Sequence, residues 1–68
     1  MTVGSQVKQT LASLKSAHAT LQTYALQSRD DESKTVFEEG VKITGEIIDG
    51  LEERLKTLEF EEPQYKGF

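Results

Sequence analysis

Apolar residues recur at alternating steps of four and three along two segments of this chain, and this spacing limits the folds open to it. The first series runs through Val7, Leu11, Leu14, His18, Leu21, Ala25 and Ser28. Such steps place residues along one stripe of an α-helix, in the heptad pattern of helices that pack against each other. No proline interrupts the series and the only nearby glycine, Gly4, stands at its start. The pattern predicts a helix over residues 3–28.

A second series with the same steps runs through Phe37, Val41, Thr44, Ile48, Leu51, Leu55 and Leu58. Asp30 or Asp31 can cap the start of this helix with its carboxylate. Pro63 limits the far end, because the residue before a proline disfavours helical geometry. We expect a helix over residues 31–60 and an extended tail over residues 61–68, with the chain forming a single domain over residues 1–68.

The link between the two predicted helices is short, so the helices must lie as antiparallel neighbours. The predicted fold is therefore an all-α, antiparallel two-helix hairpin. One flank of the first helix carries Lys8, Lys15, Gln22 and Arg29, and the matching flank of the second carries Glu38, Gly45, Glu52 and Glu59. These flanks face each other in an antiparallel pair. Exposed ion pairs add little stability, so we expect them to act on orientation and register.

The distribution of charge excludes one class of partner. The net charge is −4, divided as +3 over residues 1–29 and −7 over residues 30–68. Three dispersed cations are a poor footprint for nucleic acid, whose binding requires several neutralised phosphates. No apolar run approaches the ~20 residues that cross a bilayer, and the first residues do not resemble a signal peptide. We expect a cytoplasmic protein with no transmembrane segment.

The short length points to self-association. A chain of 68 residues buries only ~60% of its unfolded surface, so disulfides, a metal or oligomerisation must add stability. The chain has no cysteine and one histidine, which leaves oligomerisation and predicts no metal or other cofactor. We expect a homo-oligomer, with a dimer forming a four-helix bundle favoured. Side-by-side pairing and exchange of helices both remain open.

The second helix has more apolar surface than one partner helix can cover. The residues that we expect at an interface are Tyr24, Val36, Gly40, Ile43, Ile47 and Gly50. Glycine costs ~1 kcal/mol relative to alanine inside a helix. Gly40 and Gly50 therefore either admit the close approach of another helix or are tolerated defects. Tyr24 either packs across an interface or caps the edge of the core.

We call the line of contact between the two heptad series the seam. His18 and Thr44 fall close together on it if the hairpin folds in register. A hydrogen-bonded polar pair that fixes the register is the plainer interpretation. The alternative is a ligand-binding site around these two residues. No nucleophile, phosphate-binding loop or metal-ligand spacing accompanies them, so we predict no catalytic residues and no enzyme activity.

The tail carries residues suited to a partner's groove: Pro63, Gln64, Tyr65, Lys66 and Phe68. It either docks onto a partner or onto the bundle, or it is disordered, as many terminal segments are.

The two ends of the chain resemble those of a known family. They read Met-Thr-Val-Gly-Ser-Gln-Val-Lys-Gln-Thr-Leu-Ala-Ser-Leu-Lys-Ser over residues 1–16 and Glu-Glu-Pro-Gln-Tyr-Lys-Gly-Phe over residues 61–68. They are similar to a short, uncharacterised family, a domain of unknown function, from endospore-forming bacteria of the bacillus group. Its members are often encoded beside genes for the spore channel that moves dipicolinic acid. The resemblance implies a role in sporulation or spore resistance, in the forespore or spore, and no catalytic residues.

These observations favour a non-enzymatic helical module for protein–protein interaction, an accessory factor in sporulation. The alternative function is a small-ligand-binding helical bundle with its site around His18 and Thr44.

Overall fold

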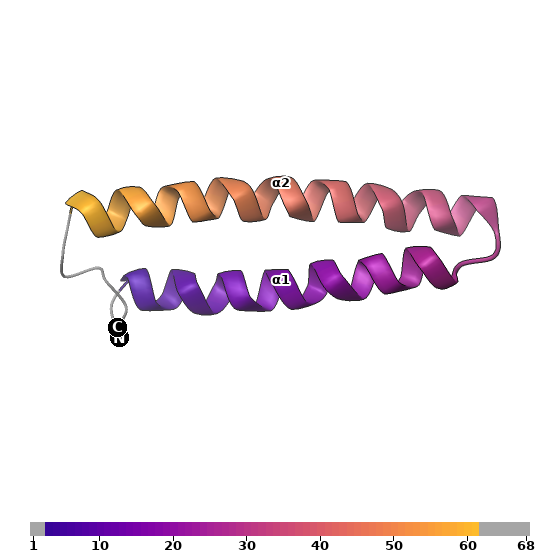
Figure 1. The fold of residues 1–68 in the computed structure, drawn as a ribbon, viewed down its shortest axis with the longest axis horizontal. Coiled ribbons are helices and arrows are strands. Elements are labelled where there is room, and N and C mark those ends of the chain that lie inside the picture. Colours follow the sequence, from indigo (N-terminus) through magenta and orange to yellow (C-terminus); the bar gives the residue numbers. More distant parts are fainter. Residues whose placement is uncertain (1–2, 62–68) are drawn as a thin grey trace.

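The computed structural model of the chain describes residues 3–61. It consists of α1 (Val3–Gln27) and α2 (Asp31–Glu61), which lie side by side and run in opposite directions (Figure 1). The predicted all-α helical hairpin is therefore confirmed. Each helix ends within one residue of its predicted boundary, α1 at Gln27 and α2 at Glu61. The predicted tail site lies outside the described residues: Pro63, Gln64, Tyr65, Lys66 and Phe68.

Hydrogen bonds from local side chains define the turn between the helices. The backbone N–H and the hydroxyl of Ser28 both donate to the carbonyl of Tyr24, at 2.9 and 2.8 Å. Asp30 caps α2, because its Oδ2 accepts from the Ser33 N–H at 2.8 Å. This backbone N–H is the main reason why the pKa of the Asp30 carboxyl lies below its ordinary value of 3.8. The turn thus stops one helix and starts the next within three residues, 28–30.

The core is one narrow line of side chains where α1 and α2 meet. Leu11, Ile48 and Leu55 form its buried centre, 6–9% exposed. Val7, Leu14 and Leu51 pack against them. All of these positions belong to the two heptad series, and the other members of both series are buried or half-buried as well. Within residues 3–61, no large side chain is fully enclosed. The hairpin therefore has a seam rather than a closed core.

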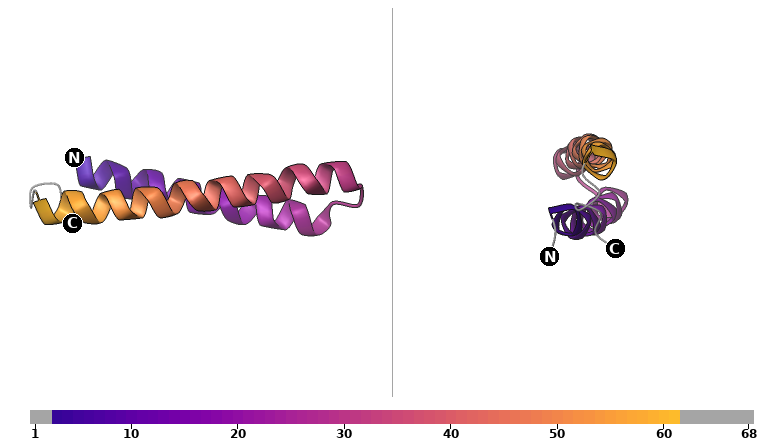
Figure 2. Two further views of the ribbon diagram at one scale, coloured as in Figure 1. Left: turned by 90° about the horizontal axis from the view of Figure 1, so that it is seen from above. Right: turned by 90° about the vertical axis from the view of Figure 1, so that its left-hand side faces the viewer.

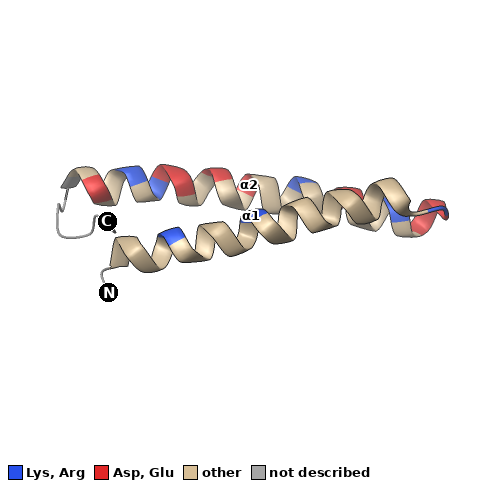
Figure 3. Cartoon of the chain, turned by 60° about the horizontal axis from the view of Figure 1, so that its bottom comes forward, with Lys and Arg blue, Asp and Glu red and all other residues tan. Residues whose placement is uncertain are grey.

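The molecule is a flat rod. Its Cα atoms extend over 48 × 17 × 11 Å, with the two helices crossing at a shallow angle (Figure 2). Such a shape has two broad faces, one on each side of the seam. Charge is unevenly divided between the helices, since the acidic residues lie on α2 and most of α1 is uncharged (Figure 3).

Two ion pairs join the flanks that the sequence predicted to face each other. The Lys15 Nζ lies 2.8 Å from a carboxylate oxygen of Glu52, and the Lys8 Nζ lies 3.4 Å from one of Glu59. The two pairs are seven residues apart on each helix, as antiparallel heptads require. They confirm the predicted register. The hydrogen bond from Lys15, together with its charge, lowers the pKa of the Glu52 carboxyl from the ordinary value of 4.5.

This lowered pKa predicts the direction of a pH effect. A carboxyl whose pKa is lower in the folded state stabilises the fold above its unfolded pKa, and this contribution is lost as the pH falls through the folded value. We therefore expect Glu52→Gln to weaken the dependence of the melting temperature on pH below 4.5. Lys15→Gln should remove the same component, and the double variant should remove no more. Identical acid profiles for wild type and Glu52→Gln would contradict the assignment.

Candidate interaction surface

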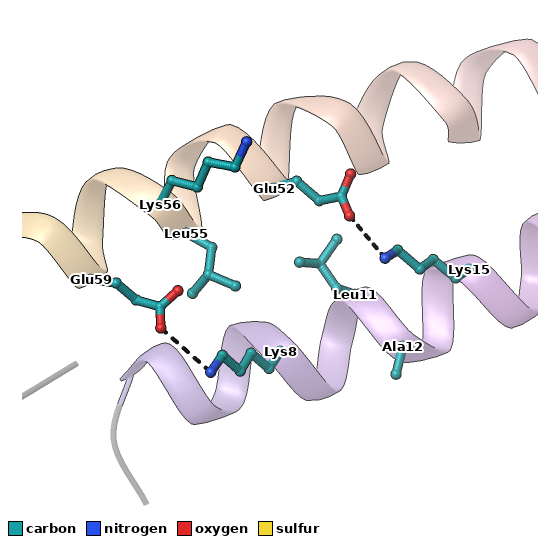
Figure 4. Close-up of a pocket in the computed structure, with 8 residues that line it drawn as sticks. All are labelled: Lys8, Leu11, Ala12, Lys15, Glu52, Leu55, Lys56 and Glu59. Atoms are coloured by element: carbon teal, nitrogen blue, oxygen red, sulfur yellow. Dashed lines mark ion pairs between the residues drawn. The ribbon is translucent and has the colours of Figure 1, made fainter. Parts of the chain in front are cut away.

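The two broad faces of the hairpin differ in chemistry. We call one the charged face; it contains the two ion pairs, Lys8–Glu59 and Lys15–Glu52. An open groove of about 480 Å³ runs along it, lined by the charged side chains together with Leu11, Ala12 and Leu55. Figure 4 shows the ion pairs crossing from helix to helix, with the side chains of Leu11 and Leu55 between the two pairs. The charges of this groove therefore bind the two helices to each other.

The opposite side, which we call the neutral face, is formed by the heptad positions that flank the seam away from the ion pairs. Its residues on α1 are Val3, Gln6, Thr10, Ser13, Ala17, Thr20, Tyr24 and Gln27. Its residues on α2 are Ser33, Val36, Gly40, Ile43, Ile47, Gly50, Arg54 and Thr57. Arg54 is its only charged residue. This is unusual in a chain with twenty charged residues among sixty-eight, eight basic and twelve acidic.

Exposed apolar side chains gather on the neutral face. Seven large hydrophobic residues among the described residues are well exposed, and all but Leu26 and Phe60 belong to this face. Val36 is 65% exposed, Ile43 48% and Ile47 46%. The sequence predicted these three at an interface, and in the described part of the hairpin they keep about half or more of their surface exposed. A contiguous, exposed apolar surface of this kind marks an interaction site more often than isolated exposed residues do.

Tyr24 lies at the turn end of the neutral face. Its ring packs on that of Phe37, with centroids 5.5 Å apart and the planes tilted by 56°. Phe37 belongs to the seam, so Tyr24 caps the edge of the core within the hairpin. It nevertheless remains 46% exposed. Tyr24 can therefore contribute its outer surface to a partner, and that second role stays a prediction.

The glycines of α2 differ in what surrounds them. A Cβ atom at Gly40 would lie 3.4 Å from Leu21 Cδ1, which is an ordinary van der Waals contact with a side chain of α1. A Cβ at Gly50 would have no neighbour within 4 Å. Gly40 thus lies against α1, whereas at Gly50 the hairpin makes no use of the missing side chain.

His18 and Thr44 are in contact in the seam. The His18 Nδ1 and the Thr44 Oγ1 are 2.8 Å apart. The Thr44 Oγ1 also lies 2.8 Å from the carbonyl oxygen of Gly40. The hydroxyl has one proton to donate, so which of the two side chains donates in the His18–Thr44 contact depends on the tautomer of His18. Because these atoms satisfy each other, the geometry favours a structural pair; a ligand site there stays a prediction.

Gly45 is a packing position that the sequence did not single out. A Cβ atom there would lie 3.3 Å from the Cε1 of His18, which is tighter than ordinary contact. The missing side chain thus makes space for the imidazole ring beside Thr44. In the sequence, Gly45 follows Thr44 and lies on the flank nearest His18. This position alone does not predict a contact with His18, because the contact depends on where the imidazole ring lies.

Among residues 3–61, no group of three or more His, Asp or Glu side chains is placed to hold a metal ion. Neither described helix is apolar enough over a sufficient length to span a bilayer. The described surface therefore has two features that a partner could contact. One is the exposed area of the neutral face, and the other is the fixed pattern of charge on the charged face.

A family model for proteins of unknown function, DUF1657, matches residues 7–55, which is more than half of the chain. The chain belongs to the DUF1657 family. Curated proteins and solved structures give no match to it. The region matched by the DUF1657 model includes the seam from Val7 to Leu55 and, on the neutral face, Tyr24 through Arg54. The tail residues Pro63 to Phe68 lie beyond that match.

The packing of the His18 ring against Gly45 in this DUF1657 protein can be tested by a double-mutant cycle. Replacing glycine by alanine inside a helix normally gains about 1 kcal/mol. We expect Gly45→Ala to gain less than this in wild type, because the new methyl group crowds the His18 ring. In a His18→Ala background the full gain should appear. The free energy of unfolding, measured by urea titration, checks this; an equal gain in both backgrounds would show that Gly45 and His18 are not coupled.

Proposed function

We propose that this protein is a non-enzymatic helical interaction module that pairs with a second copy through the neutral face, forming a four-helix bundle. The exposed apolar side chains of Val36, Ile43 and Ile47, on a face whose one charged residue is Arg54, carry the proposal. Burying each large aliphatic side chain stabilises an assembly by about 1.5–3 kcal/mol before association costs. A hairpin with a single narrow seam needs such a contribution.

The shape of the face suits a dimer. The Cα atoms extend over 48 Å by 17 Å across the broad faces and over 11 Å between them. A second hairpin of the same dimensions can therefore stack along the full length of the neutral face.

Three hydroxyl groups of the neutral face are compatible with burial. The hydroxyl of Thr10 donates to the Gln6 carbonyl at 3.1 Å, and that of Thr20 donates to the Ser16 carbonyl at 3.0 Å. The Thr57 hydroxyl on α2 does the same to the Glu53 carbonyl at 3.2 Å. Because their protons are satisfied within each helix, removing them from water costs less than it would for free hydroxyls.

Light scattering over a concentration series tests the dimer. We expect a mass of twice the 7.6 kDa chain. Ile43→Asp should shift the protein to monomer, because a carboxylate buried without a partner is strongly unfavourable. Leu26→Asp is the matched control, because Leu26 is 83% exposed and lies outside the neutral face. The Leu26→Asp protein should therefore remain a dimer.

Circular dichroism of each variant establishes that the helices remain. A wild-type mass of one chain at every concentration would overturn self-association through the neutral face. So would an Ile43→Asp protein that stays dimeric.

For the cellular setting we propose sporulation or spore resistance, inside the cell or forespore. The support for this setting is the resemblance of the two ends, residues 1–16 and 61–68, to the family from endospore formers. A fluorescent fusion expressed from the native promoter should appear during spore formation and collect in the forespore. Deletion should reduce spore resistance. Uniform expression in growing cells, with spores of normal resistance after deletion, would contradict this role.

A further inference from the structure

Gly50 has no function inside the hairpin that would offset its cost. Gly45 lies beside His18, where its missing side chain makes room for the ring, and Gly40 lies against Leu21. Gly50 is exposed and has open space around the position of a Cβ. Glycine destabilises a helix interior relative to alanine. The space at Gly50 is therefore available to something outside the hairpin.

The spacing of residues along α2 indicates what fits that space. Val36 and Gly50 lie seven residues before and after Ile43, so the three residues share one stripe of the helix. A second α2 helix related by a two-fold axis at Ile43 would run antiparallel. It would set Val36 opposite Gly50 of the partner subunit, and Ile43 opposite its own copy. Val36 then meets a position without a side chain, and the pairing is the same from both subunits, as a self-complementary interface requires.

The neighbouring stripe follows this symmetry to within one residue. Gly40 and Ile47 lie three residues before and four residues after Ile43, so the same axis places Ile47 one residue from the level of Gly40 of the partner subunit. Charge is complementary as well. Arg54, the one charged residue of the neutral face, falls level with the first turn of the partner's α2, which carries Asp31 and Glu32.

We infer that the two copies dock α2 against α2, antiparallel, about a two-fold axis at Ile43. This inference rests on the proposed function and specifies how the partner is placed. The other way to stack two hairpins sets α2 over α1 of the second copy. There the apolar stripe of α2 would face mainly hydroxyl and small side chains, such as Ser13, Ala17 and Thr20. Pairing α2 with α2 buries apolar surface against apolar surface, which is the stronger driving force.

Cysteine cross-linking of the full chain tests this arrangement, because the sequence contains no cysteine of its own. Ile43→Cys lies on the axis and should form a covalent dimer under mild oxidation, visible on a non-reducing gel. The matched control is Glu46→Cys, which is exposed on the same helix but outside the neutral face, and should stay monomeric. A mixture of Val36→Cys and Gly50→Cys proteins should cross-link more than either alone.

Each outcome separates this geometry from the proposed function. A wild-type dimer in which Ile43→Cys cross-links no more than Glu46→Cys would overturn the axis at Ile43 but leave the proposed dimer standing. Cross-linking of Ile43→Cys with Ala17→Cys, in place of Ile43→Cys with itself, would assign α2 to α1 instead. A wild-type protein that is monomeric by light scattering would overturn both.

Discussion

The seam between α1 and α2 is the contact on which every other feature of this protein depends. A helix in a two-helix hairpin has only one neighbour, so each helix can bury only one stripe of side chains. Leu11, Ile48 and Leu55 occupy the centre of that stripe, and solvent reaches the seam from both broad faces. The ion pairs and the His18–Thr44 pair do not enlarge this core. They fix how the two stripes align, and therefore which side chains are left outside.

Much of this arrangement can be predicted from the sequence because a heptad repeat specifies orientation as well as helicity. Once Leu11 and Ile48 are placed in the seam, Lys15 and Glu52 must flank it, and Ile43 must lie beyond it. A link of only three residues then leaves one relative direction for the helices. Helix ends followed from local chemistry, with Asp30 acting as the cap that its carboxylate suggested.

What the sequence could not supply depends on the shape of individual side chains. Gly40 and Gly50 were alike in the sequence as possible helical defects, yet Gly40 lies beside Leu21 while Gly50 lies in open space, and Gly45 lies beside His18. Those differences arise from the positions of side chains on the opposite helix, which periodicity does not describe. Tyr24 is a similar case, since its packing on Phe37 depends on how both rings turn near the end of the hairpin.

The hairpin begins and ends at the same extremity of the rod, where Val3 lies beside the end of α2 (Figure 1). Tension applied between these two points acts across the seam rather than along it. It therefore separates the helices one heptad layer at a time, loading the Lys8–Glu59 pair first and the Tyr24–Phe37 contact last. A structure pulled in this direction resists with the strength of a single layer, whatever its total length. Its mechanical resistance is thus set locally, while its thermodynamic stability is summed over the whole seam.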